Sequence, residues 1–244
     1  MADREISRYG VESCKTLWRL SRRKYQAMNL PPRKAQGFGR FDDPALQVAY
    51  SEGEYGVLYL ATDPKSAFME ALAGLRSNLK SRQSVLQGAI MDINDRNEFE
   101  SESRGSASVV STEWQDDWQL TGATITTMAP VFDLTDAAAV QFVRDRLAIT
   151  LVSMGLTDLD FGHLLSDNRD LTRAISRWIW SLESEEGSPL FSGIRYRSRF
   201  DPECICIALY ENRYTVDGDI GTQSISPETP GFAEAASALR LTTA

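Results

Sequence analysis

Residues 192–211 read SGIRYRSRFDPECICIALYE and contain the two patterns on which the fold assignment depends. The apolar run 204–210 predicts a buried β-strand. Ahead of it, Ser198 stands between Arg197 and Arg199, and alternation along an extended chain turns its side chain away from both arginines. This charged segment suits an anionic ligand, although such runs are often only surface.

Upstream of this stretch, strands and helices follow one another without regular alternation. The patterns predict strands at 56–61 and about 85–93, a strand and turn at 131–136, and helices at 11–22, 66–80, 136–154 and 171–184. Thr62 or Asp63 is expected to cap the second helix, with Pro64 in its first turn. This order predicts an α+β fold, a single domain with a compact mixed sheet flanked by helices. The chain has no strand–GxGxxG–helix unit and no GxxxxGK[ST] motif, which excludes the doubly wound dinucleotide fold and the NTPase phosphate loop.

The domain is expected to span residues 11–215, with a polar insertion at about 94–128 that is interpreted as a long surface excursion. Trp114 and Trp118 are candidates to anchor this excursion. Residues 216–244 are rich in Thr, Ser, Gly and Pro and predict a peripheral C-terminal tail with a last short helix.

The charge, the cysteine content and the apolar runs of the chain argue against several classes of function. The 244 residues include 34 acidic and 26 basic side chains, a formal net charge of -8, which disfavours direct nucleic-acid binding. Cys14, Cys204 and Cys206 form no disulfide framework, so a cytoplasmic location is expected. No apolar run has the length of a membrane span, and the first residues do not form a signal peptide.

The single histidine, His163, excludes multi-His metal sites, and no metal site is expected. Any Ser-His-Asp or Cys-His catalyst would have to use this histidine. Its surroundings, LDFGHLLSD, contain no nucleophile elbow, so His163 is interpreted as a structural or surface residue.

Four side chains are candidates for chemistry, and each also has a plain structural interpretation. Arg40 ends a basic loop that contains glycine and could bind an anion or form a surface ion pair. Tyr59 and Glu70 flank a strand-to-helix turn. Glu70 is surrounded in sequence by apolar residues, so it is either a compensated buried carboxylate or a solvated helix residue. Ser198 lies in strongly positive surroundings.

The order of four short segments resembles that of the RES family, which is named after an Arg, a Glu and a Ser. The segments are GRF (39–41), VLYLA (57–61), AFMEAL (67–72) and GIRYRSRF (193–200). The resemblance covers about residues 18–210 and implies an ADP-ribosyltransferase-like fold. It also implies an NAD⁺-consuming bacterial toxin that is encoded beside a neutralising antitoxin.

Carried over to this sequence, the resemblance makes Arg40, Glu70 and Ser198 the catalytic residues. Arg40 would bind a phosphate of NAD⁺, and Glu70 would stabilise the positive charge that develops on the ribose. Tyr59 and Phe41 would stack against nicotinamide or ribose, and Ser198 would form a hydrogen bond there. No cofactor is required, because NAD⁺ is the substrate. Phe41 stands where the family often has Trp or Tyr.

The expected reaction is cleavage of the nicotinamide–ribose bond by a glycohydrolase or a phosphorylase. A protein ADP-ribosyltransferase using the same site and a non-catalytic nucleotide-binding module are the alternatives. Glu203 and Cys204 stand where the family often has an Asn. The contact that this Asn makes with the ligand is therefore not carried over to this chain. The expected partners are NAD⁺ and a cognate antitoxin that contacts the basic loop 31–40, with no nucleic acid and no membrane.

Overall fold

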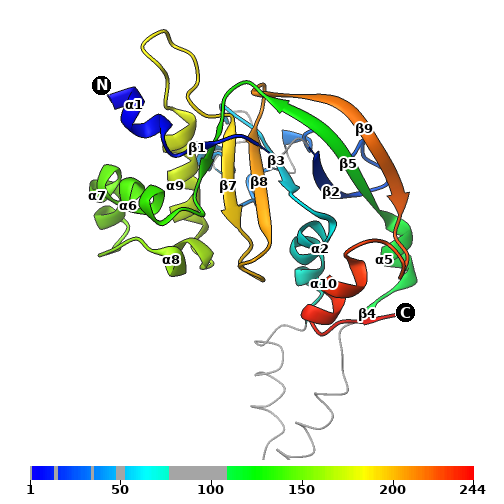
Figure 1. Ribbon diagram of the computed structural model, residues 1–244. Coiled ribbons are helices and arrows are strands. Elements are labelled where there is room, and N and C mark those ends of the chain that lie inside the picture. The colour runs from blue at the N-terminus through cyan, green and yellow to red at the C-terminus, as the bar shows by residue number, and fades with distance from the viewer. Residues whose placement is uncertain (1, 14–15, 34–35, 48–52, 77–108) are drawn as a thin grey trace, which may run out of the picture.

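The computed structural model describes residues 2–13, 16–33, 36–47, 53–76 and 109–244, which form a mixed sheet with helices packed against it (Figure 1). The eight strands are ordered β1-β6-β7-β8-β3-β2-β5-β9, and only β6 and β7 pair in parallel. The strands are β1 (Gly10–Val11), β2 (Thr16–Arg22), β3 (Val57–Ala61), β5 (Trp118–Thr127), β6 (Val131–Asp133), β7 (Gly193–Arg197), β8 (Ile205–Tyr210) and β9 (Tyr214–Ser224). A separate parallel pair joins β4 (Val109–Val110) and β10 (Thr242–Thr243).

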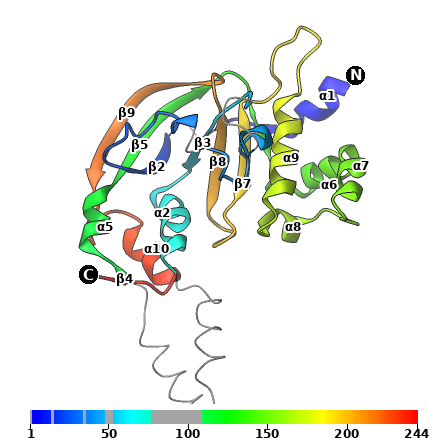
Figure 2. The ribbon, with the colours of Figure 1, turned by 180° about the vertical axis from the view of Figure 1, so that it is seen from behind.

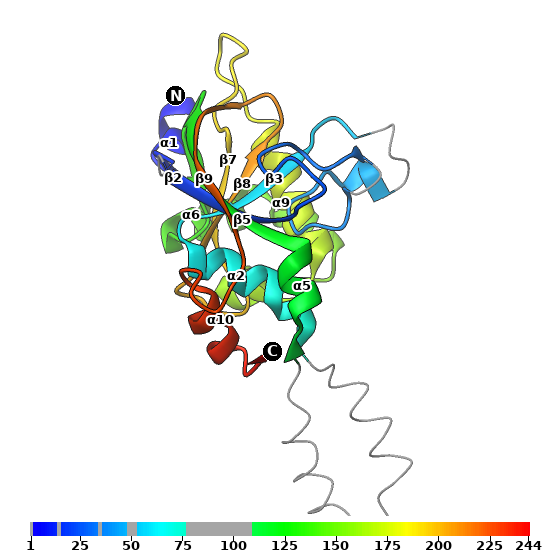
Figure 3. The same cartoon turned by 90° about the vertical axis from the view of Figure 1, so that its right-hand side faces the viewer.

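The helices form two groups. Figures 1 and 2 show α6 to α9 gathered beside β7, while α2 and α10 lie under the curve of β5 and β9. The view in Figure 3 shows α2 and α10 next to each other, where the rings of Phe68 and Phe232 meet with centroids 5.3 Å apart. The helices are α1 (Ala2–Ser7), α2 (Pro64–Leu72), α5 (Thr112–Asp117), α6 (Ala137–Arg146), α7 (Ala148–Ser153), α8 (Phe161–Leu165), α9 (Arg169–Trp180) and α10 (Phe232–Ala238), with 3₁₀ turns η2 (Pro44–Gln47) and η3 (Ala73–Leu75).

Apolar side chains cover both faces of the central strands. On one face, Tyr196 and Cys206 pack in the same cluster as residues of both helix groups. On the other face, Leu58 and Ile207 belong to a smaller cluster, against which Met28 and Leu30 from the segment after β2 pack. The fold is therefore the predicted single α+β domain with a mixed sheet and flanking helices.

The turn from β3 into α2 follows the sequence closely. The Asp63 carboxylate caps α2 by accepting from the Ser66 amide at 2.8 Å, and Pro64 begins the helix. Both features were expected, because a capping side chain satisfies an amide that has no partner within the helix and Pro lacks that amide. The helix ends at Leu72 and continues as η3, so it is shorter than the predicted 66–80, of which residues 77–80 lie outside the described ranges.

The prediction of a helix at 11–22 is wrong. Residues 16–22 form β2, which pairs with β5 over its whole length and with β3 at Trp18. The apolar residues fit a helical spacing, but β2 has antiparallel neighbours on both sides, and its adjacent Leu17 and Trp18 pack into the clusters on opposite faces of the sheet. The tertiary environment therefore overrides the local pattern.

The interpretation of 94–128 as a surface excursion is wrong for its described part, residues 109–128. This part contains α5 and the ten-residue strand β5, which lies between β2 and β9. Trp114 and Trp118 do pack together there, with ring centroids 5.3 Å apart. The predicted strand at 85–93 and residues 94–108 lie outside the described residues.

The C-terminal residues are part of the fold and not a loosely docked tail. The expected boundary between residues 215 and 216 falls inside β9, which pairs with β5. Phe232 and Ala235 of α10 are fully buried. Two other helices differ from expectation only in their bounds, since 136–154 divides into α6 and α7 at Leu147, and the helix predicted at 171–184 is α9.

Candidate functional site

The loop that carries Arg40 is organised by a buried carboxylate. Asp42 is only 4% exposed, and its Oδ2 accepts from the amides of Gly37 and Gly39 at 2.7 and 2.8 Å. Its Oδ1 accepts from the Tyr59 hydroxyl at 2.8 Å, and that hydroxyl accepts from the Phe41 amide at 2.8 Å. A carboxylate that receives several donors can be buried without leaving its charge unsolvated.

Side chains of helix α9 donate hydrogen bonds to the backbone carbonyl groups of the same loop. The Arg173 guanidinium, which is 2% exposed, donates to the carbonyls of Gly39 and Gly37 at 3.0 and 2.6 Å. The hydroxyls of Thr172 and Ser176 donate to the carbonyls of Arg40 and Phe41 at 2.5 and 2.7 Å. The loop has no regular secondary structure of its own, so side chains of β3 and α9 supply the partners that its backbone needs.

The Arg40 side chain lies between aromatic rings and backbone carbonyls. Its guanidinium carbon is 5.4 Å from the Phe41 ring centroid and 5.3 Å from that of Tyr196, within the range of cation–π attraction. Its terminal nitrogens donate to the carbonyls of Leu164 and, at 3.5 Å, Arg197. Its Nε is buried and has no hydrogen-bond partner among the described residues.

Glu70 lies on α2, one residue after the buried Met69. Its Oε1 is the second buried atom here that no described group satisfies. The charge of Glu70 contributes to raising the pKa of Tyr196 and of Cys206, after the larger effect of burial, while the charge of Arg40 opposes the rise in both. A guanidinium and a carboxylate therefore act on the same buried phenol and thiol.

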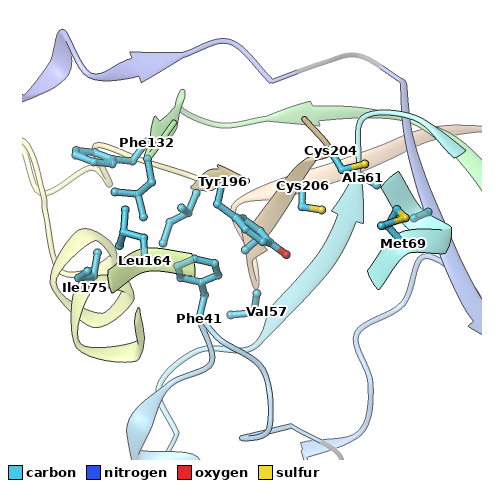
Figure 4. Close-up of a cluster of buried hydrophobic side chains, with 14 of the residues drawn as sticks. Phe41, Val57, Ala61, Met69, Phe132, Leu164, Ile175, Tyr196, Cys204 and Cys206 are labelled. Carbon is cyan, nitrogen blue, oxygen red and sulfur yellow. The ribbon is translucent and has the colours of Figure 1, made fainter. Parts of the chain in front are cut away.

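Tyr196 occupies the centre of this arrangement. Its ring packs against Phe41 with centroids 4.7 Å apart, and Figure 4 shows its hydroxyl pointing away from Phe41, toward the side of Met69 and α2. Tyr196 pairs with Cys206 across β7 and β8, which places both side chains on one face of the sheet. Tyr196 is thus a group that Arg40 contacts and on which the charge of Glu70 also acts.

Ser198 follows β7 and is fully buried. Its amide donates to the Cys204 carbonyl at 2.8 Å, and its hydroxyl oxygen accepts from the Phe200 amide at 3.2 Å. The two neighbouring arginines are engaged elsewhere, since Arg197 donates to the Pro202 carbonyl at 2.8 Å and Arg199 forms an ion pair with an aspartate of the α8–α9 connection. The guanidinium groups of both flanking arginines are therefore bonded to partners other than Ser198.

Arg40 and Phe41 thus contact Tyr196, Tyr59 and Glu70 contribute to raising its pKa, and Ser198 follows it by two residues, just after the end of β7. Sequence reasoning missed the residues that organise the site, namely Asp42, Arg173, Tyr196 and Cys206. The sequence did contain a signal for Tyr196. Alternate residues of an extended chain share a face, so Tyr196 points to the same side as the candidate Ser198.

One cation of the basic loop 31–40 is paired with an acid. Arg33 forms an ion pair with Glu211 at 2.6 Å, and Lys34 lies outside the described residues. Two hollows border the loop. A small one is lined by Arg40, Phe41, Tyr196 and residues of α8, and a larger one of about 550 Å³ lies between residues 36–38 and the beginning of α9.

His163 lies on α8, and its Nδ1 is 2.7 Å from Oδ1 of Asp160, the residue that caps this helix. The hydroxyl of Ser166 bonds the His163 carbonyl and not its ring. Within the described ranges, no group of three His, Cys, Asp or Glu side chains could hold a metal ion. None of the helices described in the structure is long and apolar enough to cross a bilayer.

Comparison with protein families assigns residues 16–224 to the RES domain, which is most of the chain. This chain belongs to the RES domain family. Membership associates the domain with toxin–antitoxin pairs and with NAD-related enzyme activity. Comparison with curated proteins and with solved structures gave no match. The matched range begins at β2 and ends with β9, so it includes β2, β5 and β9, three strands that the sequence patterns missed.

Proposed function

We propose that this RES domain cleaves the nicotinamide–ribose bond of NAD⁺, as a glycohydrolase or a phosphorylase, and acts as a bacterial toxin. The observation that carries the proposal is that two of the four buried atoms without a described partner, Arg40 Nε and Glu70 Oε1, belong to side chains whose charges both act on Tyr196. An unpaired buried donor or charged oxygen costs free energy. A ligand that offers an anionic group to one and hydroxyl groups to the other removes both costs, and NAD⁺ carries both.

In the proposed complex, Arg40 binds the diphosphate. Its planar guanidinium presents several N–H donors in a fixed geometry that suits phosphate oxygens. The bonds of Arg40 to the carbonyls of Leu164 and Arg197 fix the side chain before the substrate arrives. A group that is already oriented loses less conformational freedom on binding.

Glu70 supplies the chemistry at the ribose. Cleavage of the nicotinamide bond develops positive charge on the sugar ring, as in glycoside hydrolysis. A carboxylate oriented beside that ring stabilises the charge and accepts hydrogen bonds from the ribose hydroxyls. Such electrostatic stabilisation is often the largest single contribution to catalysis.

Phe41, Tyr196 and Ser198 complete the proposed site. The two rings form an apolar wall next to Arg40, against which nicotinamide or ribose can stack. The Ser198 hydroxyl oxygen accepts one bond from the Phe200 amide, and its hydrogen can be donated to the nicotinamide amide. Nicotinamide leaves, and water or phosphate takes its place on the ribose.

Three related points follow from family membership and are proposals as well. The fold is ADP-ribosyltransferase-like, the protein acts in the cytoplasm, and a cognate antitoxin covers the mouth of the site. Residues 36–40 are the part of the predicted antitoxin contact, loop 31–40, that borders the site.

The experiment is to incubate the purified chain with NAD⁺, with and without phosphate, and to separate the products by chromatography. Release of nicotinamide by the wild type but not by Glu70→Gln supports the proposal. Free ADP-ribose or its phosphorylated form then identifies the acceptor. If no nicotinamide is released in either buffer, free NAD⁺ cleavage is wrong, and labelled NAD⁺ with candidate target proteins tests for a transferase.

A further inference from the structure

The hydroxyl of Tyr59 both donates and accepts a hydrogen bond within the protein. It donates its one hydrogen to Asp42 Oδ1 at 2.8 Å and accepts from the Phe41 amide at 2.8 Å. Burial raises the pKa of this phenol well above its ordinary value, and the charge of Asp42 raises it further. The hydroxyl therefore stays protonated and remains a donor to Asp42.

Tyr59 and Asp42 together hold the backbone on both sides of Arg40. Asp42 Oδ2 accepts from the Gly39 amide, immediately before Arg40, and Tyr59 accepts from the Phe41 amide, immediately after it. The approach is close, since a Cβ on Gly39 would lie 2.2 Å from the Tyr59 hydroxyl oxygen. Any residue other than glycine would displace this pair.

The same backbone is held from the opposite side by α9. Arg173 donates to the carbonyl of Gly39, Thr172 to that of Arg40 and Ser176 to that of Phe41. The peptide groups around Arg40 are therefore fixed through both their N–H and C=O groups. The side chain of Arg40 leaves this backbone in one direction, between the rings of Phe41 and Tyr196.

We propose that Tyr59 and Asp42 are positioning residues that act through Arg40, and that the Tyr59 hydroxyl forms no bond to the substrate. This assignment rests on the proposed function insofar as Arg40 binds NAD⁺. It gives Tyr59 a different role from the stacking contact that the family resemblance implies. The two roles differ in one measurable way, because a positioning residue loses its effect when the residue that it positions is removed.

The test is a double-mutant cycle of Tyr59→Phe and Arg40→Ala, measured as kcat/KM for NAD⁺ cleavage. Tyr59→Phe keeps the ring and removes both hydroxyl bonds, so kcat/KM is expected to fall about tenfold, mainly through KM. In the Arg40→Ala background, the same change should alter kcat/KM less than about twofold. A fall of similar size in both backgrounds would show a direct substrate contact and overturn the proposal.

Two further measurements separate positioning from general loss of stability and from failure of the proposed function. Tyr9→Phe is the matched control, because Tyr9 is a buried tyrosine whose hydroxyl bonds Arg8 far from the loop. Amide hydrogen exchange requires no activity. In Tyr59→Phe, exchange should rise at Phe41 and also at Gly39, whose partner is Asp42. Unchanged exchange at Gly39 would overturn the proposal even if the wild type leaves NAD⁺ intact.

Discussion

The loop 37–42 and the strand β9 are held in the fold in different ways. The loop has no helix or strand, yet its amides and carbonyls bond to Asp42, Tyr59 and α9. β9 is a strand of eleven residues at the edge of the sheet, where most of its residues are exposed and its pairing with β5 has two register shifts. In this molecule, side-chain bonds to the backbone hold the candidate site from several elements, whereas the sheet edge is held by pairing with one strand.

The two regions also differ in how their polar groups are satisfied. The outer edge of β9 can bind water, whereas Arg40 Nε and Glu70 Oε1 are buried and have no partner among the described residues. If the loop and α2 form a reacting site and β9 is scaffold, equivalent substitutions in the two regions should have very different effects. The predictions below use β9 as the reference wherever it offers a matched residue.

The largest expected effect is that of Glu70→Gln. The change keeps the shape of the side chain and removes its charge, so nicotinamide release should fall at least about a hundredfold. The matched control is Asp219→Asn in β9, which replaces an exposed carboxylate with an amide and should leave turnover within about twofold of wild type. Near-normal turnover of Glu70→Gln would remove this residue from the chemical step.

Next in size is the effect of Arg40→Ala on NAD⁺ affinity. Loss of charge-assisted hydrogen bonds should raise Kd by about tenfold to a hundredfold. Calorimetric titration in the Glu70→Gln background measures binding without turnover. Arg144→Ala, at an exposed ion pair with Asp158, is the control and should not change Kd. Equal affinities of the two variants would exclude Arg40 from the phosphate site.

Local sequence signals predicted one half of the site better than the other. The apolar strand 57–61, the Asp63 cap and Pro64 placed Glu70 correctly on a helix that follows β3. These signals act over a few residues, so they can be read from the chain. Ser198 was likewise placed at the end of an extended segment before the apolar strand β8.

The remaining features depend on contacts between distant segments, which periodicity does not encode. β2 and β5 pair over about a hundred residues of intervening sequence, and the many Thr residues of β5 made it look like a polar loop although they suit a strand. An arginine such as Arg173 is expected on the exposed side of a helix. It is buried because its guanidinium donates hydrogen bonds to carbonyls of the loop 37–39, which is distant in sequence.

A smaller expected effect concerns stability and contrasts two glycines. Gly39→Ala places a methyl group 2.2 Å from the Tyr59 hydroxyl oxygen and 2.6 Å from Asp42 Oδ1, so it should lower the free energy of unfolding by about 1–3 kcal/mol. Gly218→Ala in β9 meets no atom within 4 Å and should change it by less than about 0.5 kcal/mol. Denaturant unfolding of both variants measures the difference, and equal stabilities would contradict the close approach at Gly39.

The smallest expected effect is that of His163→Ala, which should leave NAD⁺ turnover within about twofold of wild type. His163 lies on α8, where its ring and amide bond Asp160 and lower the pKa of that carboxyl. The variant removes the ring but keeps the amide, so the helix cap at Asp160 is retained. The carbonyl of the neighbouring Leu164 accepts a hydrogen bond from Arg40. If the substitution displaced α8, it would therefore disturb Arg40 first, and KM would rise with kcat unchanged. Complete loss of kcat in a variant with wild-type stability would instead require His163 in the reaction and return the Ser- or Cys-dependent hydrolase as the better description.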